Sequence, residues 1–466
     1  MNFRRPHVYP FASPFKSSKR WSATMLTVLA VVWPGLGSQP AVAAGTAPQP
    51  VEIRLWHAMS GAQGQSLEHV TAAFNESQRD FRVVPVYKGE YRATLSAGLA
   101  AAKSRSAESP HLLQVYEEGT ADVLAARHAF KPLFALAAET RINIEPDRIS
   151  APAASVYADK TGRLLAFPLN SSTPVLYLNR DTFIKSGMDP DKPPKTWYEM
   201  QPVLIALQNA GADCPYTTSR QSWVHIENTN AWHNNPIASE DNGLGGTRAE
   251  LRVNGHLMIR HISLLGAWVR SQLFRISGRA DEGDTRFASG ECAMLTSSST
   301  ARAEITRKAQ FRVGVAQLPY YDDFNNAPYN TLSGGAALWA VGNTTARESL
   351  GMARFLAYLA TPAVAADWQQ SAGYVPVTQN AYATLQRSGY YKTNPEMDIA
   401  ATQMRGYRSG AFTKGVRLGD YDKIRAILDD ELDDVWKGVK APISALDEAV
   451  QRGNVVLRAF ERAQPR

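Results

Sequence analysis

Short apolar runs alternate along the chain with segments in which apolar residues recur every three or four positions. In the first third, strand-like runs occur at residues 51–57, 82–87 and 111–116. Between them lie segments with helical spacing or high alanine content, at residues 67–74 and 93–102. Strands and helices in this order are typical of an α/β fold, with parallel strands covered by helices.

The alternation resumes with other partners in the second half of the chain. The predicted elements are, in order, a helix from the Thr196–Glu199 capping box to Leu207, a helix within 254–274, a strand at 292–296 with a helix to 309, strands at 311–318 and 334–341, a helix opened by Thr361 and Pro362, and a mostly helical C-terminus. No internal repeat or low-complexity run is present in the sequence.

Residues 164–179 (LLAFPLNSSTPVLYLN) place four polar side chains inside an otherwise apolar segment. Buried side chains such as those of Asn170 to Thr173 need hydrogen-bond partners, which can come from the protein, from water or from a ligand. The pattern by itself leaves these three sources open.

The N-terminus changes the picture given by composition. The chain has 466 residues, which favours two or three domains, and a formal net charge of +7. Residues 1–44 contain five basic and no acidic side chains, then an apolar run and an Ala-Val-Ala end, which together predict a cleaved signal peptide and export to the periplasm. An uncleaved anchor is the alternative. The rest of the chain holds 45 basic against 43 acidic side chains, which disfavours nucleic-acid binding.

Sequence motifs for catalysis, cofactors and metals are absent. His225 and Glu227 lie near His233, but their spacing matches no metal site, so we expect surface or groove roles for them. The two cysteines, Cys214 and Cys292, are an even number in an exported chain, which indicates one disulfide. Two buried thiols are the alternative. An exported α/β protein without a catalytic motif is expected to bind a ligand rather than to catalyse a reaction.

A series of short motifs follows along the chain: LWHAMSG (55–61), YKGEY (87–91), LQVYE (113–117), NSSTPVLY (170–177), PPKTW (193–197), Gly334-Gly335, Thr361-Pro362, Gly373-Tyr374 and FTKGVRLG (412–419). In this order they resemble the periplasmic sn-glycerol-3-phosphate-binding proteins of ABC importers, within extracellular solute-binding protein family 1. The resemblance covers essentially all of the chain after the predicted signal peptide.

The resemblance implies a type II, maltose-binding-protein-like fold with a ligand cleft between two lobes. The first lobe would comprise residues 45–172 and 332–372, and the second residues 173–331 and 373–466. The crossover at 164–179 would then expose its hydroxyls to the cleft, where a polar ligand satisfies them.

The ligand residues implied by the resemblance are Tyr91, Glu117, Ser172, Ser298, Gly335, Tyr374 and Arg425. Arg425, with Tyr374 and Ser298, would hold a phosphate, because guanidinium groups and helix starts favour anions. Glu117 would face the glycerol hydroxyls at the opposite end of the cleft, and the Gly335 backbone would approach the ligand. The alternatives without the resemblance are a surface or capping role for Glu117, an ion pair of Arg425 with Asp429, and serines at 297–299 that cap a helix.

One stretch departs from the family pattern. The family has two tryptophans in a GWxGW motif on the cleft wall, whereas this chain keeps only Trp223 and has Arg220 in place of the first tryptophan. The contact of the first ring is therefore in doubt, and Arg220 would add positive potential.

The implied function is periplasmic capture of sn-glycerol 3-phosphate and glycerophosphodiesters by a monomer, without cofactor or metal, for membrane permease subunits driven by a cytoplasmic ATPase. An oligosaccharide-binding protein of the same fold is one rival, with Trp56, Trp223 and Trp232 as sugar-stacking rings. An exported phosphodiesterase or glycosidase is another, but it would need a metal cluster or paired carboxylates.

Overall fold

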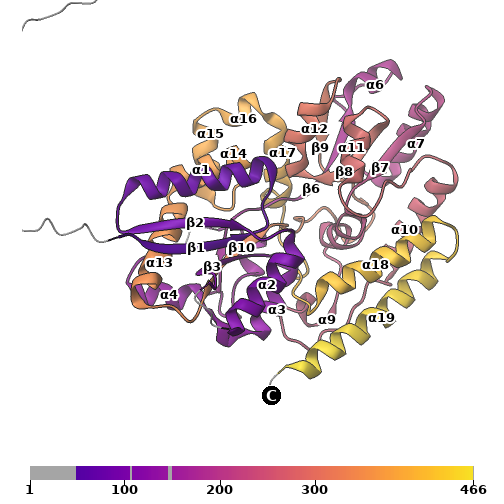
Figure 1. The fold of residues 1–466 in the computed structure, drawn as a ribbon. Helices are drawn as coiled ribbons and strands as arrows, with labels where there is room; N and C mark the ends of the chain where they lie inside the picture. Colours follow the sequence, from indigo (N-terminus) through magenta and orange to yellow (C-terminus); the bar gives the residue numbers. More distant parts are fainter. Residues whose placement is uncertain (1–48, 105–107, 145–148, 465–466) are drawn as a thin grey trace, which may run out of the picture. The chain divides into compact units, whose positions relative to one another are not determined.

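The structure, a computed structural model, describes residues 49–104, 108–144 and 149–464. The predicted signal peptide lies outside the described residues. Two separate β-sheets, each covered by helices, form the two lobes of the fold (Figure 1).

The first sheet has the strand order β2-β1-β3-β10-β4. β1 (Val51–His57) is parallel to both β2 (Phe81–Tyr87) and β3 (Leu112–Tyr116), as the sequence pattern predicted. β10 (Ala336–Val341) returns from the second sheet and therefore runs antiparallel to β3. The short strands β4 (Phe130–Lys131) and β5 (Phe167–Pro168) also pair with β10.

The second sheet has the order β7-β8-β6-β9 and mixes parallel and antiparallel pairs. β7 (Cys214–Thr218) is parallel to β8 (Cys292–Ser298), whereas β6 (Pro174–Asn179) is antiparallel to β8 and to β9 (Val313–Ala316). Cys214 and Cys292 face each other in this register and are joined by a disulfide with an S–S distance of 2.10 Å.

Helices cover both sheets and make up most of the C-terminal part (Figure 1). They are α1 (Gly61–Ser77), α2 (Tyr91–Ser104), α3 (Thr120–Ala125), α4 (Leu133–Thr140), α5 (Ala151–Ser155), α6 (Arg180–Lys185), α7 (Trp197–Asn209), α8 (Thr229–Trp232), α9 (Ser239–Asn242), α10 (His256–Arg270), α11 (Glu282–Ala288), α12 (Arg302–Lys308), α13 (Ala346–Ala360), α14 (Pro362–Ala372), α15 (Gln379–Arg387), α16 (Tyr390–Thr393), α17 (Pro395–Arg405), α18 (Tyr421–Trp436) and α19 (Pro442–Ala463). Short 3-10 turns are η1 (Glu117–Gly119), η2 (Arg127–Ala129) and η4 (Ser299–Ala301), and η3 (Ser222–Asn228) is a π-helix.

Local sequence signals explain several of these boundaries. Thr196 accepts a hydrogen bond from the Glu199 N–H and Glu199 returns one, so the predicted capping box opens α7. Pro362 is the first residue of α14, where its missing N–H costs nothing. Thr361 precedes it as predicted, but its hydroxyl donates to the Tyr358 carbonyl instead of capping α14.

Each sheet has its own apolar core. Phe74, Leu112 and Phe355 belong to the core beside the first sheet, and Trp197 and Trp268 belong to the core beside the second. Among the described residues no single helix is long and apolar enough to cross a membrane. Within that part of the chain, α13 and α14 together have the necessary length and apolar composition, but they are bent by 75° at their junction.

Three chain segments cross between the sheets side by side. Ser172 and Gly334 exchange two backbone hydrogen bonds of 2.8 Å, and the Val375 N–H donates to the Ser171 carbonyl at 2.8 Å. These crossings lie near the lobe limits expected at residues 172, 332 and 372, and the limits themselves stay a prediction.

Candidate functional site

The polar residues of the first crossover are bonded mainly within the protein. Ser171 shares a hydrogen bond of 2.7 Å with Ser333, and Thr173 shares one of 2.6 Å with Thr331, both between hydroxyl groups. The Ala336 N–H donates to Oδ1 of Asn170 at 2.7 Å. The expectation that a ligand satisfies all of these hydroxyls is therefore wrong, because the three crossing segments satisfy one another.

Two neighbouring polar groups at the crossover make no well-formed hydrogen bond to the described residues. These are Nδ2 of Asn170 and the hydroxyl of Tyr374, both of which can donate. Burial and the nearby Tyr91 raise the pKa of Tyr374, and the neighbouring Tyr116 and Asn170 lower it by a smaller amount. A buried donor that makes no good hydrogen bond lowers the stability of the fold. The position of these two donors therefore favours a ligand group that only accepts hydrogen bonds, such as a phosphate oxygen.

Gly335 is held tightly against the first crossover. Its φ is 132°, and a Cβ there would lie 2.4 Å from the Asn170 carbonyl oxygen. Its N–H donates to a Glu117 carboxylate oxygen at 3.0 Å, and its carbonyl accepts from the Glu117 N–H at 3.0 Å. The structure thus requires glycine at position 335 because the first crossover segment at Asn170 lies so close. The sequence interpretation gave the approach of the ligand as the reason instead.

Arg425, on α18, is surrounded by carboxylates. Its Nε and Nη2 donate to the two oxygens of Glu227 at 2.6 and 2.9 Å. Nη2 also donates to Glu117 at 3.2 Å, and Nη1 contacts Glu118. The placement of Glu117 and Arg425 at opposite ends of the cleft is therefore wrong, since the two side chains form an ion pair.

The alternative partner of Arg425 is not used either. No contact joins Arg425 to Asp429 among the described side chains, and Asp429 lies instead beside Ser222 and Gln221. Burial raises the pKa of Asp429 to about 6.

The neighbours of Arg425 are well buried. Glu227 is 2% exposed, and Arg425, Glu117 and Glu118 are 16%, 13% and 22% exposed in their side chains. Glu117 and Glu118 follow β3 of the first sheet, whereas Glu227 lies on η3 beside α18. Arg425 therefore links the first lobe to the second through charge-assisted hydrogen bonds.

Tyr91 and Arg220 lie near each other at the edge of this cluster. The ring centroids of Tyr91 and Tyr116 are 3.3 Å apart. Burial raises the pKa of Tyr91, while Tyr116 and the positive charge of Arg220 lower it. Arg220 forms a two-pronged pair with Asp281 at 2.7 and 2.9 Å, so much of the positive potential expected from it is compensated.

Trp223 and Ser172 lie on either side of Gly334. A Cβ on Gly334 would come within 2.8 Å of the Trp223 ring and 3.1 Å of the Ser172 hydroxyl. Trp223 therefore packs against the crossover at Gly334. Its place at a ligand stays a prediction.

Ser298 has a structural task. Its hydroxyl accepts from the Thr300 N–H at 3.3 Å and shares a hydrogen bond of 2.8 Å with the Thr300 hydroxyl, so it caps η4 as the alternative interpretation held. Within the described part of the chain, no hydrogen bond joins its side chain to the residues around Arg425, and its ligand role stays a prediction.

We name the residues that these contacts bring together the crossover site. They are Tyr91, Tyr116, Glu117, Glu118, Asn170, Ser172, Trp223, Glu227, Gly335, Tyr374 and Arg425.

Sequence interpretation missed Tyr116, Glu118 and Glu227 as members of the site. The expected surface or groove roles of His225, Glu227 and His233 are wrong as regards the surface, since all three are buried. The signal was present, because a carboxylate in a largely apolar helix needs a buried partner.

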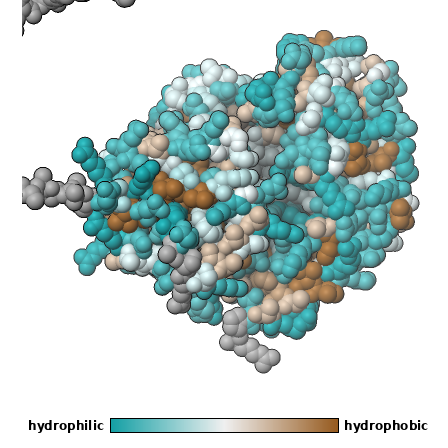
Figure 2. Space-filling view, in the orientation of Figure 1, coloured by the Kyte–Doolittle hydropathy of each residue, from teal (hydrophilic) through white to brown (hydrophobic). Residues whose placement is uncertain are grey.

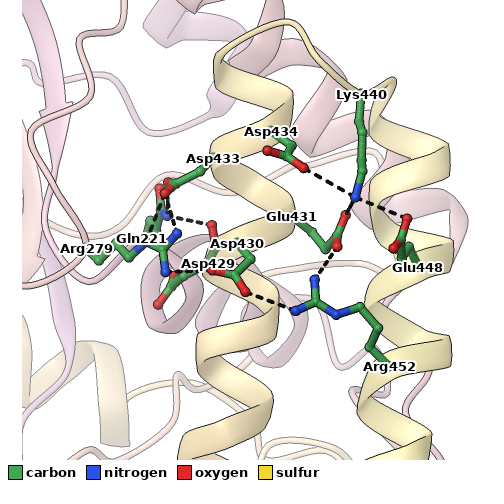
Figure 3. A network of polar contacts seen from close by, with 10 residues as sticks. All are labelled: Gln221, Arg279, Asp429, Asp430, Glu431, Asp433, Asp434, Lys440, Glu448 and Arg452. Atoms are coloured by element: carbon green, nitrogen blue, oxygen red, sulfur yellow. Dashed lines mark hydrogen bonds and ion pairs between the residues drawn. The ribbon is translucent and has the colours of Figure 1, made fainter.

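An ion-pair network on two sides of α18 holds the helix that carries Arg425 (Figure 3). Arg279 pairs with Asp430 and Asp433, and Gln221 beside η3 donates to Asp433 at 3.0 Å. The contacts with α19 and the loop before it are Arg452 with Asp430 and Glu431, and Lys440 with Glu431, Asp434 and Glu448. These bonds tie α18 both to α19 and to the start of the π-helix.

A pocket of about 560 Å³ lies apart from the crossover site. It is lined by residues of α3, η2 and α19 and of the loops that follow α5, α9 and α17, including Arg127, Lys160, Arg417 and Phe460. None of the predicted ligand residues lines it. The described residues also hold no group of three or more His, Cys, Asp and Glu side chains arranged to bind a metal ion.

Two lobes, three crossings and a cluster of buried polar and charged side chains at the crossings define a solute-binding protein. The face seen in Figure 2 is mostly hydrophilic, with apolar side chains in small groups. Residues 69–399 match the bacterial extracellular solute-binding protein family, and the chain belongs to this family of binding proteins.

Its relatives include the sn-glycerol-3-phosphate-binding periplasmic protein UgpB of Yersinia pseudotuberculosis, 44% identical over 413 residues, which are 88% of this chain and 93% of the relative. The protein of the same name from Salmonella typhimurium is 44% identical over 412 residues, with the same coverage of both chains.

Solved structures share the fold. UgpB from Mycobacterium tuberculosis in complex with glycerophosphocholine has a TM-score of 0.72 at 19% identity, covering 89% of this chain and 99% of that one. The cyclic alpha-maltosyl-1,6-maltose binding protein from Arthrobacter globiformis has a TM-score of 0.70 at 18% identity, covering 88% and 100%.

Proposed function

We propose that this protein is the periplasmic substrate-binding component of an ABC importer for sn-glycerol 3-phosphate and glycerophosphodiesters. It would capture its ligand between the lobes as a monomer and deliver it to membrane permease subunits driven by a cytoplasmic ATPase. The observation that carries the proposal is the crossover site, where buried donors that lack a well-formed hydrogen bond belong to the same cluster as an arginine that is ion-paired with residues of both lobes.

The chemistry of this site suits a phosphate attached to a hydroxyl-bearing group. Asn170 and Tyr374 offer donors to acceptor oxygens, and the guanidinium of Arg425 is the group that pairs phosphate best. The carboxylates of Glu117 and Glu118 can accept from glycerol hydroxyls. The names of the relatives at 44% identity agree with this ligand class.

The alternative function, oligosaccharide binding, depends on three tryptophan rings, and their surroundings give it little support. The ring of Trp232 is fully buried, and its Nε1 donates to the Leu318 carbonyl at 2.9 Å. Trp56 is covered by the Lys88 ammonium 3.9 Å from the ring centroid. Only Trp223 of the three lies at the crossover site, whereas sugar clefts stack several rings on the ligand.

Calorimetric titration of the purified exported protein tests the proposal. We expect saturable binding of glycerol 3-phosphate and glycerophosphocholine, and none of maltose or glycerol at the same concentrations. Binding of maltose without binding of either glycerophosphate would overturn it. Mass spectrometry of the exported chain provides a separate check, since a start near Ala44 or Gly45 is expected.

A further inference from the structure

The pocket of about 560 Å³ lies between elements that belong to the two sheets, and we name it the interlobe pocket. Leu124 and Leu165 pack against the core formed by β3 and β10 of the first sheet. Leu418 and Leu457 belong to the core beside the second sheet. In Figure 1 the pocket lies where α3, the loop after α9 and the C-terminal end of α19 come together. Its volume is within the range of about 300–1,000 Å³ that is usual for small-molecule sites.

Large apolar side chains line much of the interlobe pocket. They are Leu124, Leu165, Leu244, Leu418, Leu457 and Phe460. Leu244 is half-buried and belongs to no apolar core among the described residues, so the pocket is its main surrounding. A hydrocarbon chain in such a space gains free energy with each CH₂ group that leaves water.

The charged side chains at the interlobe pocket are mostly positive. Arg127, Lys160 and Arg417 line it, and Asp159 is the only acidic side chain among the described residues that do so. The Asp159 carboxylate is already paired with Arg163. Arg127 and Lys160 are exposed and make no ion pair within the described part of the chain. The charge of the pocket therefore favours an anionic group.

Arg417 is a cation held by carbonyl groups instead of carboxylates. Its Nε donates to the Val156 carbonyl at 3.2 Å. Its Nη2 donates to the carbonyls of Ser155 and Ala158 at 3.0 and 2.7 Å. Burial lowers the pKa of Arg417 to about 10, and the charge of Asp159 raises it by a smaller amount. The guanidinium is therefore charged at neutral pH, fixed in position at the end of α5, and stabilised by any anion that enters the pocket.

We propose that the interlobe pocket is a second binding site, which takes a single-chain amphiphile with an anionic head group, such as a medium-chain fatty acid. The apolar chain lies against the leucines and Phe460, and the carboxylate pairs with Arg417 and with Arg127 and Lys160 beside it. This ligand differs in class from the one proposed for the crossover site. Because it contacts elements of both lobes, it favours the relative position of the lobes in which the pocket exists.

Calorimetric titration of the purified exported protein with decanoate, octanoate and decanol, each below its micelle-forming concentration, tests the proposal. We expect decanoate to bind saturably and about tenfold more tightly than octanoate, because its longer chain buries further CH₂ groups. Decanol has the chain without the charge, so it should bind about threefold more weakly than decanoate, or weaker still.

Substitutions at the pocket locate the site. Leu244→Trp fills the space and should abolish the binding of decanoate. Arg127→Glu/Lys160→Glu should weaken decanoate by about tenfold and leave decanol unchanged. Arg347→Glu/Lys392→Glu changes the net charge equally at exposed positions of α13 and α16, and this control should change neither ligand. Thermal unfolding shows which variants are folded.

Three results would overturn the proposal. The first is a wild type that does not bind decanoate saturably. The second is unchanged decanoate binding in the folded Leu244→Trp and Arg127→Glu/Lys160→Glu variants, or an equal loss in the control pair. The third is displacement of decanoate by saturating glycerophosphocholine, because the fatty acid would then occupy the crossover site.

Discussion

Arg425 is held by a carboxylate that solvent barely reaches. Glu227 binds two of its nitrogens from η3, and Glu117 and Glu118 approach from the end of β3. The resemblance in sequence identified Arg425 and Glu117 as members of one site. It could not show that they touch, because Glu227 and Glu117 lie 198 and 308 residues away from Arg425 along the chain and meet it only through the packing of the lobes.

Removal of the Arg425 guanidinium should weaken both binding and folding. Arg425→Ala is expected to cost about 2–5 kcal/mol of ligand binding and about 3–5 kcal/mol of folding stability, since Glu227 then stays buried without its cation. Arg425→Lys should also bind poorly, because an ammonium cannot serve two carboxylates and a phosphate with a planar fork.

Calorimetry and urea unfolding measure these two losses. Arg347→Ala, at an exposed position of α13, is the matched control. Wild-type affinity in both Arg425 variants would show that the ligand does not use this residue.

At the scale of elements, the sequence pattern predicted most strands and long helices, but not how distant elements combine. The helix predicted within 254–274 is α10, and the strands predicted at 311–318 and 334–341 are β9 and β10 with shorter limits. Polar segments, by contrast, were assigned to the ligand although they bond to other crossings, as at Ser171 and Thr173. The spacing of apolar residues shows which face of an element is buried, but it does not show which distant residues hydrogen-bond to its polar side chains.

The disulfide joins two neighbouring parallel strands of the second sheet. Cys214 of β7 and Cys292 of β8 are 78 residues apart, and closing a loop of this length in the unfolded chain is worth about 4.5 kcal/mol in the chain-entropy model. We expect dithiothreitol to lower the Tm of the wild type, and thiol labelling of the unfolded, non-reduced protein to find no reactive cysteine.

The double variant Cys214→Ala/Cys292→Ala should unfold at the same temperature with and without reductant. An equal loss of Tm in that variant would mean that dithiothreitol acts elsewhere, and two labelled thiols in the wild type would contradict the bridge.

At the scale of the whole molecule, the second lobe contains a buried chain of hydrogen-bonding side chains. His225 contacts Tyr216 at 3.2 Å and His261 at 3.1 Å, and His261 contacts the Tyr321 hydroxyl at 3.1 Å. Burial lowers the pKa of His225 to about 3, that of His233 to about 4, and that of His261 well below its usual value. Neutral imidazoles are therefore part of the folded core.

Acid should weaken this core in a predictable window. A histidine with a folded-state pKa below its unfolded value of 6.5 stabilises the fold fully above pH 6.5 and loses that contribution as the pH falls toward the folded value. Raised pKa values, about 7 for Asp122 and about 6 for Asp284, act in the opposite direction. The wild type and a histidine variant share these carboxylates, so the difference between their unfolding free energies reports the contribution of the histidine.

We therefore predict the difference in unfolding free energy between the wild type and His225→Gln. It should be constant above pH 6.5 and should move against the wild type by about 1.4 kcal/mol per pH unit between pH 6 and 4. Urea unfolding at several pH values measures it, and a difference independent of pH would mean that His225 titrates normally in the fold.

The π-helix η3 sets the direction of Glu227 relative to Trp223. Its hydrogen bonds reach five residues back, as from the Thr229 N–H and hydroxyl to the Val224 carbonyl, which adds one residue to the turn between Trp223 and Asn228. Loss of a single codon within this turn would restore ordinary helical bonding and turn the remaining side chains of the turn by roughly 100° relative to Trp223. Trp223 would stay beside Gly334, while Glu227 would turn away from Arg425. One deletion event would thus separate the Trp223 ring from the carboxylate that anchors Arg425, without altering either sheet.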